Sequence, residues 1–199
     1  MTSAQLTTSD GHAIEGDLTL PPPGTDLAGA VVLCHPHPQH GGNRFNTVVT
    51  ALYDALPAAG HAALRFDFRR EFAGGDGERL DVVAALDHLD TVAELADVPR
   101  YVVGYSFGAV VALNTRDDRI SAVVAIAPPL AVMTATDPGV PTRVVVPRHD
   151  QFSPPDATEP IVTTWPSVDV TIVESADHFL AGRTGEVARL VVAWLAAPQ

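Results

Sequence analysis

The sequence contains no lysine, so its twelve basic side chains are all arginine. Without lysine, the protein cannot use Schiff-base chemistry or a lysine nucleophile. Acidic residues outnumber basic ones by 24 to 12, which gives a formal net charge of −12. Because a strongly acidic surface repels phosphate backbones, we predict that the protein does not bind nucleic acid.

Long apolar runs are also missing, and cysteine is scarce. No apolar run approaches the roughly 18 residues of a membrane helix, and residues 1–8 lack the basic start and apolar middle of a signal peptide. The single cysteine, Cys34, cannot form an internal disulfide. We therefore expect a cytoplasmic protein without membrane association, folded as one domain over residues 1–199. The composition does not predict an oligomeric state.

Short runs rich in β-branched residues alternate with longer amphipathic segments. The predicted strands are 12–20, 30–35, 62–68, 100–104, 122–127, 143–146 and 168–173. The predicted helices are 46–59, 78–95, 107–114 and 184–196, with a further short helix at 155–163. Residues 30–33 and 122–127 are apolar throughout, which is typical of strands buried on both faces. This alternation predicts an α/β fold with a mostly parallel sheet covered by helices on both sides.

The predicted helix at 78–95 has a clear apolar face. Its apolar side chains keep to one side of the helix, whereas three aspartates fall elsewhere: Asp81, Asp87 and Asp90.

The most specific motif is GYSFG at residues 104–108. It follows a predicted strand and opens a predicted helix, which is the setting of a G-x-S-x-G nucleophile elbow. A strand that turns directly into a helix brings Gly104 and Gly108 almost into contact, so side chains there would clash. This tight turn is expected to hold Ser106 in a strained conformation with its hydroxyl exposed, and Ser106 is the predicted nucleophile.

A serine nucleophile needs a general base that is oriented by a carboxylate. In this architecture the partners follow the serine in the order Asp, then His. His178 follows the last predicted strand, and Asp150 follows the preceding one, so both are expected at the carboxyl edge of the sheet. We predict His178 as the base and Asp150 as its partner, with Asp177 as the alternative acid. His149 is interpreted as a solvated or structural histidine.

The stretch HPHPQHGG at residues 35–42 allows two interpretations. Its histidines could bind a metal ion, but no acidic ligand is near, and His35 and His37 alternate along an extended segment. The alternative is an oxyanion hole, which needs two hydrogen-bond donors. One donor is expected to be the amide of Phe107. Between the two prolines of HPHP, the only interior amide belongs to His37, so we predict His37 as the second donor and no metal or other cofactor.

These motifs resemble the α/β-hydrolase superfamily over nearly the whole chain. The HPHP and GG pairs at 35–42, RFDFR at 65–69, GYSFGA at 104–109 and ADHF at 176–179 look like a small branch of predicted hydrolases related to dienelactone hydrolases. The resemblance implies a three-layer α/β-hydrolase fold without a lid domain. Dienelactone hydrolases use a cysteine where this chain has Ser106, so their substrate is not transferred. The sequence also departs from the branch after Arg69, so it does not predict which residues of segment 69–77 contact substrate.

The segment in which many relatives insert a lid spans only residues 129–142, too short for a helical cap. We therefore expect an open pocket, lined by Phe107 and by the predicted substrate-binding residues Phe45, Leu130, Phe152 and Phe179.

Together these features predict a serine hydrolase acting on small-molecule carboxylic esters with small or accessible acyl groups. A thioesterase, amidase or peptidase would use the same triad. A non-catalytic binding module on the same fold is the other possibility, although such modules typically lose a triad member.

Overall fold

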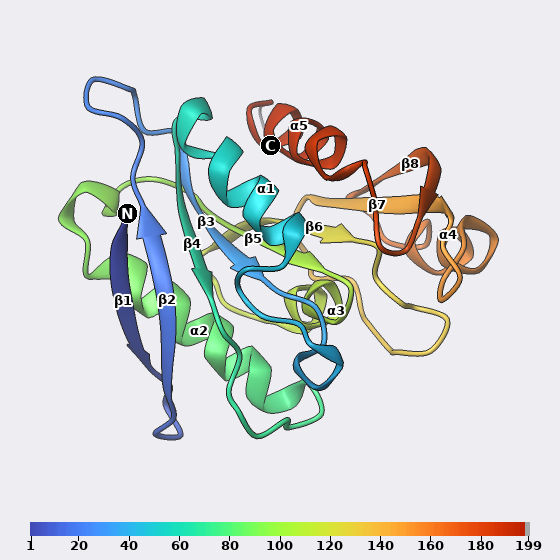
Figure 1. Ribbon diagram of the computed structural model, residues 1–199, viewed down its shortest axis with the longest axis horizontal. Coiled ribbons are helices and arrows are strands. Elements are labelled where there is room, and N and C mark those ends of the chain that lie inside the picture. The colour runs from blue at the N-terminus through green and yellow to red at the C-terminus, as the bar shows by residue number, and fades with distance from the viewer. Residues whose placement is uncertain (198–199) are drawn as a thin grey trace.

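An eight-stranded sheet runs through the computed structural model, which describes residues 1–197 (Figure 1). The strand order is β1-β2-β4-β3-β5-β6-β7-β8. The first three strands in this order pair antiparallel, and all pairs from β4 onward are parallel. The strands are β1 (Thr2–Thr7), β2 (Ala13–Thr19), β3 (Gly29–Cys34), β4 (His61–Phe66), β5 (Arg100–Tyr105), β6 (Ile120–Ile126), β7 (Thr142–His149) and β8 (Val168–Asp177).

Helices cover both faces of this sheet. They are α1 (Thr47–Ala55), α2 (Asp76–Asp90), α3 (Phe107–Asn114), α4 (Pro155–Val162) and α5 (Thr184–Leu195). The helices α1 and α5 pack together over one face, whereas α2 and α3 pack over the other (Figure 1). The predicted three-layer α/β fold with a mostly parallel sheet is therefore confirmed, and no helical lid interrupts segment 129–142.

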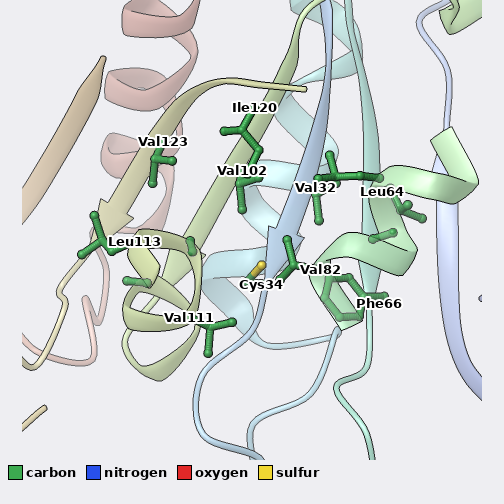
Figure 2. Packing of buried hydrophobic residues seen from close by; sticks show 14 of the residues in the cluster. Val32, Cys34, Leu64, Phe66, Val82, Val102, Val111, Leu113, Ile120 and Val123 are labelled. Atoms are coloured by element: carbon green, nitrogen blue, oxygen red, sulfur yellow. The ribbon is translucent and has the colours of Figure 1, made fainter. Parts of the chain in front are cut away.

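The central strand β3 shows why the core forms here. Its side chains alternate between two apolar layers: Val31 and Leu33 face α1 and α5, whereas Val32 and Cys34 face α2 and α3. Figure 2 shows Val32 and Cys34 beside side chains of the neighbouring strands and of α2. Burial raises the pKa of the Cys34 thiol, so this cysteine is a small core residue.

Two features of the sheet differ from the prediction. The edge strand β1 was not predicted, because only Ala4 and Leu6 of its six residues point into the core and the rest are polar and exposed. The last strand, β8, continues to Asp177, four residues beyond its predicted end. Among residues 1–197, no helix has the length and hydropathy needed to cross a bilayer.

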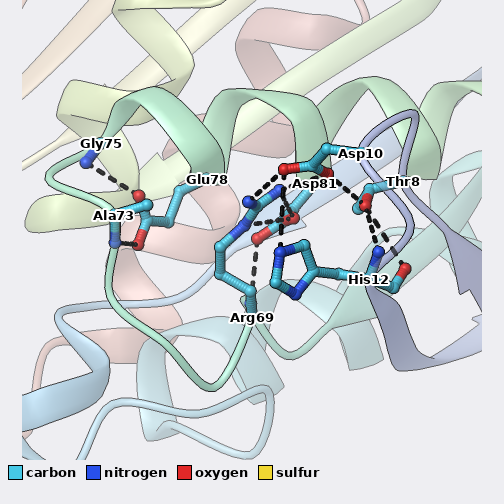
Figure 3. A network of polar contacts seen from close by, with 8 residues as sticks. All are labelled: Thr8, Asp10, His12, Arg69, Ala73, Gly75, Glu78 and Asp81. Atoms are coloured by element: carbon cyan, nitrogen blue, oxygen red, sulfur yellow. Dashed lines mark hydrogen bonds and ion pairs between the residues drawn. The ribbon is translucent and has the colours of Figure 1, made fainter.

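The burial of Asp81 corrects the sequence-based assignment of α2. Periodicity placed Asp81 off the apolar face, but its side chain is fully buried and binds the guanidinium of Arg69 at 2.8 Å. Arg69 follows β4 and also reaches Asp10, in the turn between β1 and β2, at 2.7 Å (Figure 3). A buried arginine thus joins three separate elements, and its charge explains why an aspartate lies on the inner face of α2.

Candidate active site

The GYSFG motif forms a sharp turn between β5 and α3. Ser106 occupies this turn with φ of 55°, a value that non-glycine residues rarely adopt. A Cβ atom on Gly104 would lie 2.1 Å from the carbonyl oxygen of Gly108, so only glycine fits. The amide of Ser106 donates to the Ile126 carbonyl at 2.8 Å, which ties the turn to β6. The strained conformation expected from the sequence is therefore present.

Three side chains from three loops at the carboxyl edge of the sheet form a hydrogen-bonded chain. The Oγ of Ser106 lies 2.9 Å from Nε2 of His178, and Nδ1 of His178 lies 2.8 Å from Oδ2 of Asp150. Asp150 and His178 are both buried. Because a carboxylate can only accept, Nδ1 of His178 carries the proton and Nε2 is left to accept from the serine hydroxyl.

Further contacts fix the two partners of Ser106. The second carboxylate oxygen of Asp150 accepts from the amides of Phe152, at 2.8 Å, and Ser153, at 3.0 Å. The Tyr105 hydroxyl donates to the His178 carbonyl at 2.9 Å, and the His178 amide donates to Oε1 of Gln151 at 3.1 Å. The sequence analysis did not identify Tyr105 or Gln151, because nothing in a sequence indicates a side-chain contact to the backbone of a distant loop.

The two alternative residues lie outside this chain of hydrogen bonds. Asp177 accepts from the amide of Phe179 at 3.1 Å and so caps the turn that carries His178. His149 is exposed at the end of β7. The geometry therefore favours Asp150 over Asp177 as the partner of His178.

The loop after β3 packs directly against the first turn of α3. A Cβ atom on Gly108 would lie 2.4 Å from the Cys34 carbonyl oxygen and 2.5 Å from that of His35, so this close approach requires glycine. The rings of His37 and Phe107 lie 4.8 Å apart between centroids. Among the contacts of residues 1–197, neither the Phe107 nor the His37 amide has a hydrogen-bond acceptor. Both amides are therefore free to donate, and both residues line the same cavity as Ser106.

His35 has a structural position. Its Nδ1 donates to the Pro36 carbonyl at 2.6 Å, and its Nε2 accepts from the Phe68 amide at 2.9 Å. Burial lowers the pKa of His35, which favours the neutral ring that this pattern needs. Both ring nitrogens are occupied, so neither is available to a metal ion. In the described part of the chain, no three or more His, Cys, Asp or Glu side chains gather as a metal site would require.

A cavity of about 360 Å³ contains Ser106 and His178 in its wall. The predicted residues Phe107, Phe152 and Phe179 line it, together with residues that were not predicted: His40, Asn46, Pro129, Val132 and Met133. Val132 and Met133 belong to the short segment that takes the place of a lid. The sequence located this segment near the site but gave no sign of which side chains point inward.

Two of the predicted lining residues lie elsewhere. The ring of Phe45 lies 4.7 Å from the guanidinium carbons of both Arg44 and Arg65, and it is not part of the cavity wall. Cation–π contacts with these two arginines hold the Phe45 ring outside the cavity that contains Ser106. Leu130 is 7% exposed and packs in the apolar core instead. Proximity to the motifs in sequence was a poor guide to these two side chains.

Comparison with known proteins supports the fold. The sequence model of the Alpha/beta hydrolase family matches residues 31–199. An uncharacterized protein of Rickettsia prowazekii is 30% identical over 182 residues, which cover 81% of this chain and 76% of that protein.

Two solved structures have the same architecture. An α/β serine hydrolase homologue from Coxiella burnetii is 29% identical, with a TM-score of 0.87 over 98% of this chain and 97% of that one. A serine hydrolase without a lid from Xanthomonas campestris is 24% identical, with a TM-score of 0.86 over 100% of this chain and 96% of that one. The chain therefore belongs to the α/β-hydrolase family, and like the Xanthomonas structure it has no helical lid, since no helix lies within residues 129–142.

Proposed function

We propose that the protein is a serine hydrolase that cleaves carboxylic esters through an acyl-enzyme. The observation that carries this proposal is the hydrogen-bonded chain from Ser106 through His178 to Asp150 at a strained nucleophile elbow. A structural role would not require a serine with positive φ whose hydroxyl faces a cavity and a correctly oriented imidazole.

The reaction has two halves in this proposal. The Ser106 oxygen attacks the ester carbonyl carbon while Nε2 of His178 takes the hydroxyl proton. His178 then gives this proton to the departing alcohol as the carbon–oxygen bond breaks, leaving the acyl group on Ser106. In the second half His178 takes a proton from water, the resulting hydroxide attacks the acyl carbon, and His178 returns the proton to Ser106. Asp150 keeps the imidazole in the required tautomer and stabilises its charged form.

The negative oxygen that develops in each half needs donors. The free amides of Phe107 and His37 supply them in this proposal, since donors held rigidly at such a position stabilise the transition state strongly. The His37 amide is held by the loop around it: His40 and Gly42 both donate to the His37 carbonyl at 3.0 Å. The His37 imidazole remains neutral near pH 7, because burial and the neighbouring His40 lower its pKa.

The cavity suits a small-molecule substrate with an apolar acyl group. Its wall is largely apolar, with Phe152 and Phe179 exposed at the mouth, so it suits small or accessible acyl groups. A thioesterase, amidase or peptidase would use the same groups. A non-catalytic binding module is disfavoured because all three triad side chains are in hydrogen-bonding positions.

The test is turnover of p-nitrophenyl esters of increasing acyl length, compared with matched thioesters and anilides. Ester hydrolysis that exceeds thioester and anilide hydrolysis, and that persists in EDTA, supports the proposal. Loss of activity in EDTA would instead revive a metal role for the histidines at 35–40. Binding without turnover of any of these compounds would favour the binding module.

A further inference from the structure

A second cavity adjoins the catalytic pocket. It has a volume of about 440 Å³ and lies between the start of α2, the helix α3 and the segment around Met133. The two cavities share three wall residues: Phe107, Val132 and Met133. Val132 is 72% exposed and Met133 is half-buried, so part of the shared wall stands at the surface. Because methionine is unbranched and flexible, a small movement of the Met133 side chain would let the two cavities join.

Buried polar contacts hold one wall of the second cavity. The amides of Ala73 and Gly75 donate to the two carboxylate oxygens of Glu78 at 2.9 and 2.8 Å, and Glu78 is fully buried (Figure 3). The same segment is fixed at its start, where the Arg69 amide and guanidinium both bind the Asp81 carboxylate. A loop pinned at both ends presents Gly74 and Gly75 to the cavity in a fixed position.

The opposite wall is held in a similar way. The side-chain amide of Asn114 donates to the Thr134 carbonyl at 2.9 Å and accepts from the Thr136 amide at 3.1 Å. The Ala131 amide donates to the Ser153 hydroxyl at 3.1 Å. Three hydrogen bonds therefore hold segment 129–142, which takes the place of a lid. A cavity with two fixed walls loses little conformational entropy when it binds a ligand, as expected of a binding site.

The chemistry of the two cavities differs. The catalytic pocket is lined mainly by rings and aliphatic groups, whereas the second cavity has an apolar floor of Val110 and Val111 under a polar rim. On this rim Arg79 pairs with Asp76 at 2.7 Å, so the local charges cancel. This ion pair has no net charge, but its guanidinium and carboxylate can still form further hydrogen bonds. It therefore suits a neutral polar group of a ligand better than a charged one.

Building on the proposed ester hydrolysis, we propose that the second cavity is a distal subsite of the same cleft. The preferred substrate is then an extended ester with an apolar portion next to the ester group and a neutral hydrogen-bonding group at its far end. Phe107, Val132 and Met133 stand at the junction that such a molecule must cross.

The test uses matched pairs of esters that differ only at the tip, a methyl group against a carboxamide. One series varies the acyl chain of p-nitrophenyl esters, and a second varies the alcohol chain of acetate esters, each from two to ten carbons. Above the length that reaches the second cavity, we expect the carboxamide tip to raise kcat/KM by about three- to tenfold in one series, the gain from one or two net hydrogen bonds.

A variant links this preference to the cavity. Thr134→Trp places a large ring on the rim of the second cavity and keeps the hydrogen bond from Asn114 to the backbone carbonyl of residue 134. In this variant the ratio of kcat/KM for the carboxamide-tipped ester to that for the methyl-tipped ester should fall towards one, whereas hydrolysis of p-nitrophenyl acetate should continue. Thr25→Trp, an equally large change at an exposed position between β2 and β3, is the control and should keep the ratio. The subsite would be overturned if the protein hydrolysed p-nitrophenyl acetate but showed no preference for the carboxamide tip at any chain length in either series. A preference that Thr134→Trp leaves intact would overturn it too. Failure to hydrolyse any ester would instead overturn the proposed function.

Discussion

At the scale of single residues, Asp150 and Asp177 differ in burial and in hydrogen-bond partner. Asp150 is buried and bonded to His178 at 2.8 Å, whereas Asp177 caps a turn at the surface. We expect Asp150→Asn to lower kcat by on the order of 10⁴, because the amide no longer fixes the tautomer of His178. Asp177→Asn should lower kcat far less. Steady-state kinetics on both variants, with thermal melting to show that each is folded, compares the two, and a larger loss from Asp177→Asn would contradict the assignment.

His37 separates the role of a backbone amide from that of a side chain. His37→Ala keeps the N–H and should retain most of the activity, although the ring packs on Phe107. His37→Pro deletes the donor and should lower kcat by about 10²–10³, the range for one oxyanion contact. Because a third consecutive proline can distort the loop, replacing the preceding amide by an ester through semisynthesis is the sharper experiment. Full activity of that ester variant would place the second donor elsewhere in the loop.

At the scale of secondary-structure elements, the buried pair of Arg69 and Asp81 joins α2 to the end of β4. Asp81→Asn leaves the buried guanidinium with only the half-exposed Asp10 as a charged partner, so we expect a loss of about 3–5 kcal/mol in the free energy of unfolding. Asp87→Asn, on the same helix but exposed and paired with Arg119, should lose less than about 1 kcal/mol. Urea denaturation measures both, and equal losses would show that burial of the pair does not matter.

The elements themselves were predictable to different degrees. The apolar runs of β3 and β6 predicted buried parallel strands, because both of their faces need a hydrophobic covering. The edge strand β1 was missed because it buries one face only and carries just two apolar core residues. Asp81 was misplaced because helical periodicity assigns charged residues to solvent unless a buried partner such as Arg69 is known.

The same distinction applies to the site. Ser106 and His178 could be predicted because a nucleophile elbow and a histidine after the last strand follow from local sequence and strand order. Phe45 and Leu130 could not be placed, because the direction of a side chain in a loop depends on distant partners such as Arg65. Glu78 was overlooked for a related reason: its role is to bind the amides of Ala73 and Gly75.

At the scale of the whole molecule, we expect buried histidines to make the free energy of unfolding depend on pH. In the described part of the chain, both ring nitrogens of His61 are buried without a hydrogen-bond partner, and burial lowers its pKa from 6.5. Below that pH the unfolded chain takes up a proton that the folded chain does not, so the free energy of unfolding falls as the pH drops. His35 acts in the same direction.

When the pH is lowered from 7 to 5, the free energy of unfolding should therefore fall less in His61→Leu than in the wild-type protein. Urea denaturation at several pH values measures the free energy of unfolding of both proteins. Subtracting one from the other at each pH cancels the contribution of the acidic surface, which is the same in both. Parallel pH profiles for the two proteins would show that folding does not shift the pKa of His61, which would contradict this account.

The central proposal is that Ser106 is a nucleophile activated by His178 and Asp150. The most direct measurement is labelling of the intact protein with a fluorophosphonate probe, followed by mass spectrometry and peptide mapping. We predict one adduct per chain, located on Ser106, and no adduct on the Ser106→Ala variant. An adduct that persists in Ser106→Ala, or a folded wild-type protein that takes up no probe, would contradict the account.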